Sequence, residues 1–432
     1  MGKFIAIHVL KQYNPGTFNR GEDGEAKQII CGGSNRVRFS SQCQKRAIRE
    51  MMGVEEIRTA EPEKIIDNML DIKIQEGTLA EKDKDFIGKV ICSKSVIGAD
   101  CWEKLKETKE EKNDNNDDNE DNEENVGEKK KGRVTLDTNS SELEALVNTF
   151  TDVLAERGKN VFKKAGDCKK IAQKSALNDV AISKGKALFG SMATDGAIGT
   201  VDGAVQMANA FSLDLYRPDN DLVTAKGVCR VHVDESDPFF GSYASYGEMI
   251  KNKRNAETMQ NGLSLYSNLM YEYANVNIPL LLNNRCTFIG TRQSIEATEE
   301  IKNEAKELII NFVNCMIAMV PAGAQNRSAS YVEPTAVLIE VIDNGTNEQA
   351  IWSKVLDPKD GIIDIQAIKH LSGWANNRIN LKWSNPNFNT TIKQYVMFGT
   401  PYEDFGNLYK AQKLNSLAEL AAALDKDLNS LM

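Results

Sequence analysis

The sequence is poor in the residues on which metal sites, disulfide frameworks and side-chain catalysis depend. Its 432 residues include only three histidines, His8, His232 and His370, which lie far apart and at no metal-binding spacing. Eight cysteines are scattered without a C-x-x-C pair, which fits neither a zinc site nor a small disulfide-bonded domain. We therefore expect free, mostly buried thiols, no metal and no cofactor, and we interpret His8 as a structural residue in a strand.

Long apolar segments are lacking as well. The longest candidate, residues 308–320, is interrupted by Asn311 and Asn314 and follows a charged stretch, so it is typical of a buried amphipathic helix and not of a membrane span. The opening residues MGKFIAIHVL alternate like a strand and carry no small-residue cleavage pattern. With 41% hydrophobic residues the chain can form one large or two modest cores, and we expect a soluble cytoplasmic protein.

Acidic residues are absent from Cys31–Arg49, CGGSNRVRFSSQCQKRAIR, although the whole chain has 62 of them. Gly32 and Gly33 lack a Cβ atom and let a backbone approach a ligand closely. Arg36 and Arg38 lie two residues apart, so on an extended strand they point the same way. This combination is suited to holding phosphates, and the alternative is an ordinary basic surface loop.

A helix is predicted directly after this basic strand. Ser41 and Gln44 have the spacing of a capping box, which places the free N–H groups of the helix start toward the Gly-Gly loop. Lys45 and Arg49, four residues apart, share one face of that helix.

Hydrophobic periodicity gives a coarse order of elements. We expect a second capping box at Ser141 and Glu144 to begin another helical region, which continues to about residue 188. Other expected elements are a strand at 3–11, the helix at 42–52, a mainly helical stretch at 62–105, strand-like or mixed segments at 199–212 and 270–280, a helix at 294–319 and a strand at 335–342. This order favours an α+β sheet with helices on one face.

Four blocks of the sequence are distinctive: KFIAIHVLKQYNPGTFNRGEDGEAKQIICGGSNRVRFSSQCQKRAIR at residues 3–49, LFGSMATDGAIGTVDGAVQMANAF at 188–211, LMYEYANVNI at 269–278 and MVPAGAQNRSASYVEPTAVLIEV at 319–341. They resemble blocks of the CasC family, the repeated backbone subunit of type I-E CRISPR Cascade complexes. The blocks occur in the family's order at fitting distances and cover roughly a quarter to a third of the chain.

The resemblance implies an α+β fold with a ferredoxin-like, RNA-recognition-type palm, a helical finger insertion and a thumb excursion. The implied division is 1–53 palm, 54–187 fingers with a disordered acidic insertion at about 107–131, 188–212 palm with a Gly-rich loop, 213–262 thumb, 263–400 palm and 401–432 a C-terminal helix. Aromatic residues make up only 7% and the RNA-recognition aromatic motif is not visible, so we expect contacts to the RNA backbone and not stacking on bases.

The resemblance also implies which residues contact RNA. In the first block these are Asn19, Arg20, Gly32, Gly33, Arg36, Arg38, Ser40, Gln42, Lys45 and Arg49. Met192 matches a position that wedges between nucleotides, with simple packing as the alternative.

Contacts from the later segments match the family less well. Leu222 and Val223 are candidates for the thumb tip that displaces a base. Four aromatic residues could furnish that tip instead, or pack on a neighbouring subunit: Phe239, Phe240, Tyr243 and Tyr246. In the fourth block Gln325 stands where the family has a lysine, while Arg327 keeps a positive charge.

The implied function is that of a subunit without catalytic activity. Several copies would assemble head to tail along a CRISPR RNA (crRNA), together with other Cascade subunits, and present spacer segments to a target DNA strand. The alternative is a backbone subunit that cleaves bound RNA with a loop aspartate, as in type III complexes; Asp195 and Asp202 are the possible acids, because the Gly-Gly loop has Ser34 and Asn35 instead. A P-loop is disfavoured, because SKGKALFG has neither the spacing nor a preceding strand.

Two further segments leave alternatives open. Residues 107–128 hold eleven acids and two lysines, a local net charge of 2 − 11 = −9, so the rest of the chain is neutral overall. We expect either a solvated insertion or a segment that competes with RNA for the basic groove. In 414–431, leucines and an alanine repeat at spacings of three and four, which predicts a helix that packs on its own domain or on a neighbouring subunit.

Overall fold

The computed structural model describes most of the chain. The described residues are 2–21, 25–54, 57–59, 62–98, 100–102, 136–138, 140–191, 196–217, 219–222, 262–321, 323, 329, 331–345, 348–380, 390–399 and 411–432. Of the residues singled out above, Met192, Asp195, Val223, Gln325 and Arg327 lie outside these ranges, as do Cys229, His232, the four aromatic residues at 239–246 and the acidic stretch.

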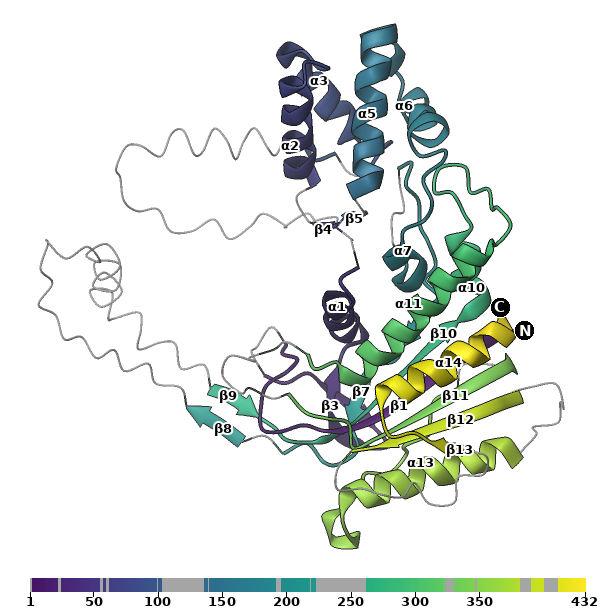
Figure 1. Ribbon diagram of the computed structural model, residues 1–432. Coiled ribbons are helices and arrows are strands. Elements are labelled where there is room, and N and C mark those ends of the chain that lie inside the picture. The colour runs from purple at the N-terminus through teal and green to yellow at the C-terminus, as the bar shows by residue number, and fades with distance from the viewer. Residues whose placement is uncertain are drawn as a thin grey trace, which may run out of the picture.

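A nine-stranded sheet forms the centre of the molecule (Figure 1). Its strand order is β13-β12-β11-β1-β10-β7-β3-β2, with β6 also paired to β10. The strands are β1 (Gly2–Gln12), β2 (Gln28–Cys31), β3 (Ser34–Phe39), β6 (Val205–Met207), β7 (Ala210–Ser212), β10 (Leu269–Asn277), β11 (Ala336–Gly345), β12 (Thr390–Phe398) and β13 (Ala411–Lys413). All pairings in this sheet are antiparallel except the one between β12 and β13.

Strand β1 is buried on both faces, and most of its buried residues are apolar. Ile5 and Ile7 belong to the core under α11 (Glu299–Ala318) and α14 (Leu417–Leu431). Phe4 and Ala6, on the opposite face, pack with α13 (Ile363–Asn380). Figure 1 shows α13 across the sheet from α11 and α14. The α+β class is confirmed, but the expectation of helices on one face is wrong, because α13 was not predicted.

The C-terminal helix α14 packs on its own chain. Leu420, Leu424, Leu428 and Leu431 are buried along one stripe, which contacts α11. Ser416 caps the helix by accepting a hydrogen bond from the Glu419 N–H at 3.1 Å. Of the two interpretations of the leucine repeat, packing on the same chain therefore accounts for the buried stripe.

A helical unit projects from the sheet beyond α1 (Ser41–Met52), as Figure 1 shows. It contains α2 (Pro62–Gln75), α3 (Glu81–Ile91), α5 (Ser140–Arg157), a 3-10 turn η1 (Lys159–Phe162), α6 (Ala165–Ile171), a π-helical turn η2 (Ala172–Ala176) and the paired strands β4 (Ile57–Thr59) and β5 (Leu136–Thr138). Its apolar core is continuous with the core under α11. The predicted helical content is confirmed here, but Ser141 lies inside α5 and not at its cap.

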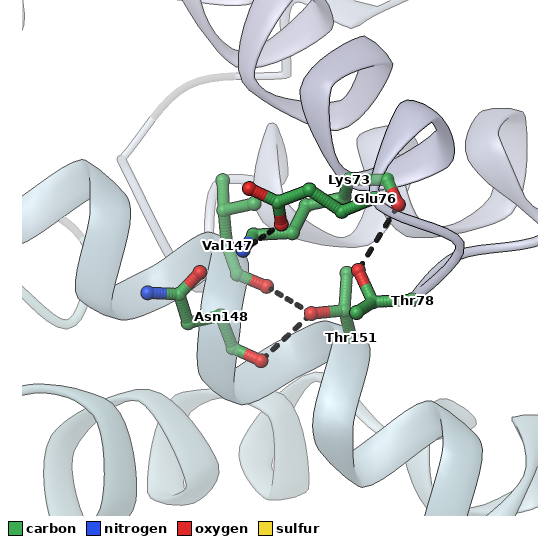
Figure 2. A network of polar contacts seen from close by, with 6 residues as sticks. All are labelled: Lys73, Glu76, Thr78, Val147, Asn148 and Thr151. Atoms are coloured by element: carbon green, nitrogen blue, oxygen red, sulfur yellow. Dashed lines mark hydrogen bonds and ion pairs between the residues drawn. The ribbon is translucent and has the colours of Figure 1, made fainter.

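Hydroxyl groups in this unit bond within their own elements (Figure 2). After α2, Thr78 Oγ1 donates to the Lys73 carbonyl at 3.0 Å, while Lys73 Nζ lies 2.7 Å from Glu76 Oε2. On α5, Thr151 Oγ1 donates to the Val147 carbonyl at 2.9 Å. Both hydroxyls are therefore satisfied by backbone carbonyls that precede them in the chain, without a partner from a facing helix.

The remaining elements lie beside the sheet. They are α7 (Lys184–Phe189), α10 (Ile278–Arg285), a 3-10 turn η3 (Pro358–Asp360) and a hairpin of β8 (Asp219–Leu222) and β9 (Gly262–Leu265). No helix in the described ranges combines the length and the apolar content that a membrane span requires.

The predicted structural roles of His8 and of the thiols agree with the fold. His8 is fully buried, with Nδ1 2.8 Å from the Tyr271 hydroxyl and Nε2 3.4 Å from Glu340 Oε2. Seven cysteines lie in the described ranges and all are free thiols, five of them buried.

Candidate nucleic-acid interface

The start of α1 is capped by side chains from three segments of the chain. Ser40 Oγ accepts a hydrogen bond from the Cys43 N–H at 3.3 Å, so Ser40 is the N-cap and not Ser41. Asn19 Oδ1 accepts from the Ser40 N–H at 3.0 Å, and Asn209 Oδ1 accepts from the Ser41 N–H at 3.1 Å. These bonds satisfy donors that would otherwise be open at a helix N-terminus.

Gln44 does not form the capping box that was predicted from the sequence. Its side chain is buried, and Nε2 donates to the carbonyls of Ala208 at 3.1 Å and Phe39 at 3.3 Å. Gln44 therefore fastens α1 to the segment before β7.

The Gly-Gly turn lies at the opposite end of β3 from α1. Gly32 and Gly33, both with positive φ, form the two-residue connection between β2 and β3. A Cβ atom on Gly32 would lie 1.9 Å from the Ser353 carbonyl oxygen, whereas one on Gly33 would meet open space. The expectation that the helix start faces this turn is wrong, because six strand residues, roughly 20 Å, separate them. Gly32 is required for packing on Ser353.

Arg36 is buried, contrary to the expectation that it contacts RNA beside Arg38. Its guanidinium donates to the carbonyls of Cys31 at 3.1 Å, Ser212 at 3.3 Å and Trp352 at 3.0 Å. These bonds tie the β2–β3 turn to the end of β7 and to the loop at 352. A phosphate outside the fold cannot reach this side chain, and we assign Arg36 a structural role.

Gln42, Lys45 and Arg49 lie at spacings of three and four on α1 and so share one face. Gln42 is exposed, and the two basic residues are half-buried. Lys45 Nζ lies 3.4 Å from the Val205 carbonyl, and the Arg49 guanidinium lies 4.9 Å from the centre of the Phe189 ring. This face therefore carries three of the predicted RNA contacts, and two of them are basic.

The electrostatics of this face favour an anion. Burial, and then the positive charge of Arg49, lower the pKa of Lys45. Among the described residues Lys45 makes no ion pair, whereas its neighbour Arg46, 82% exposed, lies 2.9 Å from Glu50. A phosphate placed against Lys45 and Arg49 would offset both the desolvation and the mutual repulsion.

The segment at Asn19 and Arg20 approaches the same helix start. The Asn19 cap holds it against Ser40, and the following Arg20 is exposed. Arg38 is half-buried on β3, opposite Phe211 of β7. The structure therefore brings Asn19, Arg20, Ser40, Gln42, Lys45 and Arg49 together around α1, with Arg38 on the strand that leads into it, and separates Gly32, Gly33 and Arg36 from them.

Two residues of this region were not predicted from the sequence. Asn209 caps α1 from a position 168 residues away, and no local pattern signals such a contact. Lys27 donates its N–H to the Asn19 carbonyl at 2.9 Å, and its charge opposes the burial that raises the pKa of Cys43 on α1. Lys27 is basic and lies four residues before the basic stretch, so the sequence offered a signal for including it among the candidates.

The other described candidates are Leu222 and Asp202. Leu222 ends β8, paired with Gly262. Asp202, the described candidate for a cleaving acid, is exposed, and in the described ranges no cluster of His, Cys, Asp or Glu could hold a metal ion.

The fold is that of a class of subunits found in CRISPR RNA-guided surveillance complexes. A chain of a "CRISPR RNA-guided surveillance complex, pre-nicking" is similar with a TM-score of 0.66 and 19% identity, over 99% of this chain and 100% of that one. A chain of a "CRISPR RNA-guided surveillance complex" is similar with a TM-score of 0.60 and 18% identity, over 99% of both. At these identities the likeness concerns the fold. No curated protein matches the chain.

The family model described as CT1975-like protein matches residues 5–230 and 242–380, and the chain belongs to this family. The resemblance to CasC-type CRISPR subunits drawn from the four sequence blocks is confirmed.

Proposed function

We propose that the protein is a crRNA-binding backbone subunit of a type I-E Cascade-like complex. The observation that carries this proposal is the shared face of α1, where Gln42, Lys45 and Arg49 lie together and where Lys45 makes no ion pair with any residue in the described ranges. The surveillance complexes that share the fold are described as RNA-guided, which supports RNA as the anion.

The arrangement suits binding without sequence preference. Cationic and amide groups contact phosphates, which carry no base identity. We propose that the central sheet is an RNA-recognition-type palm, the helical unit at 54–187 the fingers and the excursion at 213–262 the thumb. Met192, Leu222, Val223 and Arg327 are proposed to complete the RNA contacts.

We further propose that copies of the chain assemble head to tail along the crRNA with other Cascade subunits in the cytoplasm. Such heterologous contacts give an open helical filament, and the RNA sets its length. The spacer segments then pair with a target DNA strand, so base pairing and not the protein reads the sequence. In this function the subunit is not an enzyme.

The test compares two neighbouring charge reversals on one helix. The full chain is co-expressed with a repeat-spacer RNA, and RNA-containing oligomers are measured by mass photometry and RNA extraction. Lys45→Glu is expected to abolish them, whereas Arg46→Glu, which changes charge by the same amount on an exposed side of α1, is expected to retain them.

Two outcomes would contradict the proposal. If both variants lose RNA-containing oligomers equally, α1 acts through its net charge alone and not through the face that carries Lys45. RNA that shortens with time in the wild type, and no longer does so after Asp195→Asn or Asp202→Asn, would support the cleaving alternative.

A further inference from the structure

Two buried cysteines of the helical unit lie beside each other. Cys92 directly follows α3, and Cys101 lies nine positions further along the chain. The Cys101 N–H donates to the Cys92 carbonyl at 3.3 Å. A backbone hydrogen bond between two extended segments holds the Cα atoms about 5–6 Å apart, which is also the usual spacing in a disulfide. The backbone therefore has the spacing that a bond between the two sulfurs requires.

The two thiols also face each other. A hydrogen bond with the Cys101 thiol is the largest cause that raises the pKa of Cys92, ahead of burial. Both side chains belong to the apolar core, with Cys92 1% and Cys101 6% exposed. Neither forms a disulfide in the structure. The pair is therefore a reduced dithiol whose two sulfurs are neighbours.

Side-chain contacts fix the chain at both cysteines. After Cys101, the Trp102 ring packs so closely on α3 that a Cβ atom on Gly88 would lie 2.2 Å from it. The Trp102 indole N–H also donates to Asp85 Oδ1 at 3.4 Å. Within the turn from 92 to 101, Asp100 Oδ1 accepts from the Lys94 N–H at 2.8 Å. These contacts hold the two ends of the turn together.

The turn between the two cysteines supports a second segment of the chain. The Val96 carbonyl accepts a hydrogen bond from the Ala197 N–H at 2.7 Å. A Cβ atom on Gly196 would lie 2.6 Å from the Gly98 nitrogen, so the two backbones touch. A covalent bond at the base of the turn would therefore restrict both segments.

We propose that Cys92 and Cys101 form an oxidation site, a thiol pair that hydrogen peroxide converts reversibly to a disulfide. The more exposed thiol, Cys101, reacts first. Its sulfur attacks the O–O bond and keeps one oxygen as a sulfenic acid, while the thiol proton leaves with the other oxygen as water. The Cys92 sulfur then attacks the Cys101 sulfur, so that the S–S bond forms, the S–O bond breaks and a second water leaves. Two thiols thus give two electrons to one peroxide.

The chemistry of the pair limits when this reaction occurs. The raised pKa of Cys92 keeps its thiolate rare, so the pair stays reduced when peroxide is scarce. A reducing compartment returns the disulfide to the dithiol, as for other redox-sensing pairs. The inference goes beyond the proposed function and does not depend on RNA.

A trypsin site between the two cysteines makes the bond easy to detect. Cleavage at Lys94 places Cys92 in a peptide of residues 90–94 and Cys101 in one of residues 95–104. The full chain is purified with a reductant, transferred to hydrogen peroxide, blocked with N-ethylmaleimide and digested without reduction. We expect the two peptides to be joined and to separate after treatment with dithiothreitol.

The bond is also expected to stabilise the turn. The melting temperature of the oxidised chain should rise by about 3–6 °C, because the disulfide closes a short loop in the unfolded chain. Hydrogen exchange of the Ala197 amide should slow by about threefold or more, since its acceptor lies in the linked turn. Dithiothreitol should reverse both effects.

Cys168→Ala is the matched control. Cys168 is a free thiol of the same helical unit, 4% exposed, and its Sγ lies 3.4 Å from the Phe162 carbonyl. This variant is expected to give the joined peptides and the rise in melting temperature as the wild type does. Cys101→Ala is expected to give neither.

Each outcome decides one part of the inference. Peroxide-treated wild type with no joined peptides, its thiols either intact or oxidised to sulfinic acid, would overturn the oxidation site. Joined peptides with unchanged melting and unchanged Ala197 exchange would overturn the stabilising effect. If Cys101→Ala is not folded before peroxide is added, the wild type with and without dithiothreitol decides both parts.

Discussion

Lys11 of β1 is fully buried beside an equally buried glutamate. Its Nζ donates to the carbonyls of Ile317 at 3.0 Å and Met319 at 2.6 Å and lies 3.9 Å from Glu272 Oε2. The Tyr13 hydroxyl donates to Glu272 Oε1 at 2.6 Å. Burial lowers the pKa of Lys11 and raises that of Glu272, and each charge partly counters the shift of the other. The pair holds the end of α11 against the sheet.

Replacing one member of this pair is expected to lower the free energy of unfolding more than replacing both. Lys11→Met leaves Glu272 buried without its cation and is expected to lower the free energy of unfolding by about 3–5 kcal/mol. Adding Glu272→Gln removes the uncompensated charge and should recover part of that loss. Urea unfolding of the two variants measures the difference; a double variant less stable than the single one would contradict this account.

Because Arg36 is buried, we expect its substitution to reduce the stability of the fold. A residue that contacted phosphate would instead be expected to reduce RNA binding when substituted. Arg36→Ala removes three hydrogen bonds to carbonyls and is expected to destabilise the fold by about 2–4 kcal/mol. Arg38→Ala, on the same strand but half-buried, is expected to weaken RNA binding with a smaller change in stability. Thermal unfolding and RNA binding of both variants test this, and unchanged melting of Arg36→Ala together with lost binding would reverse the assignment.

At the scale of elements, one carboxylate joins three helices. Glu304 of α11 lies 2.8 Å from Lys184 Nζ of α7 and 2.6 Å from Arg285 Nη2 of α10. Burial raises the pKa of Glu304, but the hydrogen bonds from Lys184 and Arg285 outweigh it, so the pKa lies below its ordinary value. The junction also forms one wall of a cavity of about 670 Å³ between α1 and α11.

This shift predicts a weakening of the junction in acid. A depressed carboxylate pKa gives stability that is complete above the unfolded pKa and is lost as the pH falls from about 5 toward 3. The melting temperature of the wild type is therefore expected to fall more steeply over this range than that of Glu304→Gln. Glu299→Gln, an exposed carboxylate on the same helix, should follow the wild type; equal slopes for Glu304→Gln and wild type would argue against the junction.

Elements with strong local signals were predictable, and those defined by distant contacts were not. The helix α11 and the strand β11 follow from periodicity, although α11 begins at Glu299 and not near 294, because Thr298 caps it. The sequence shows that Arg36 and Arg38 are two apart on a strand. It does not show that the loop at 352 covers Arg36, and α13 and β12 went unrecognised within a range assigned only to the palm.

The same limit applies to the candidate site. The face formed by Gln42, Lys45 and Arg49 depends on helical spacing and was predictable. The Asn209 cap depends on the pairing of β7 with β3 and was not. Gly32 was correctly expected to permit a close approach, but the approaching group is the backbone of Ser353, which comes from 321 positions later.

At the scale of the whole molecule, the net charge of −9 is equal to that of residues 107–128, so the remainder is neutral. Replacing the eleven acids of this stretch by Asn and Gln at unchanged length is expected to raise affinity for non-specific RNA about tenfold at low salt. A variant with the same residues in shuffled order should bind like the wild type. Filter binding over a salt series measures this, and identical affinities for all three chains would show that the acids are only solvated.

The central position of β1 has a consequence for synthesis on the ribosome. Its neighbours in the sheet are β10 and β11, which end at Asn277 and Gly345. At roughly 5–20 residues per second, tens of seconds separate the emergence of β1 from that of its partners. During this time a mostly apolar nascent strand has no neighbouring strand to pair with and is prone to aggregate. Whether β1 reaches its place in the sheet therefore depends on strands that are translated more than 250 residues after it.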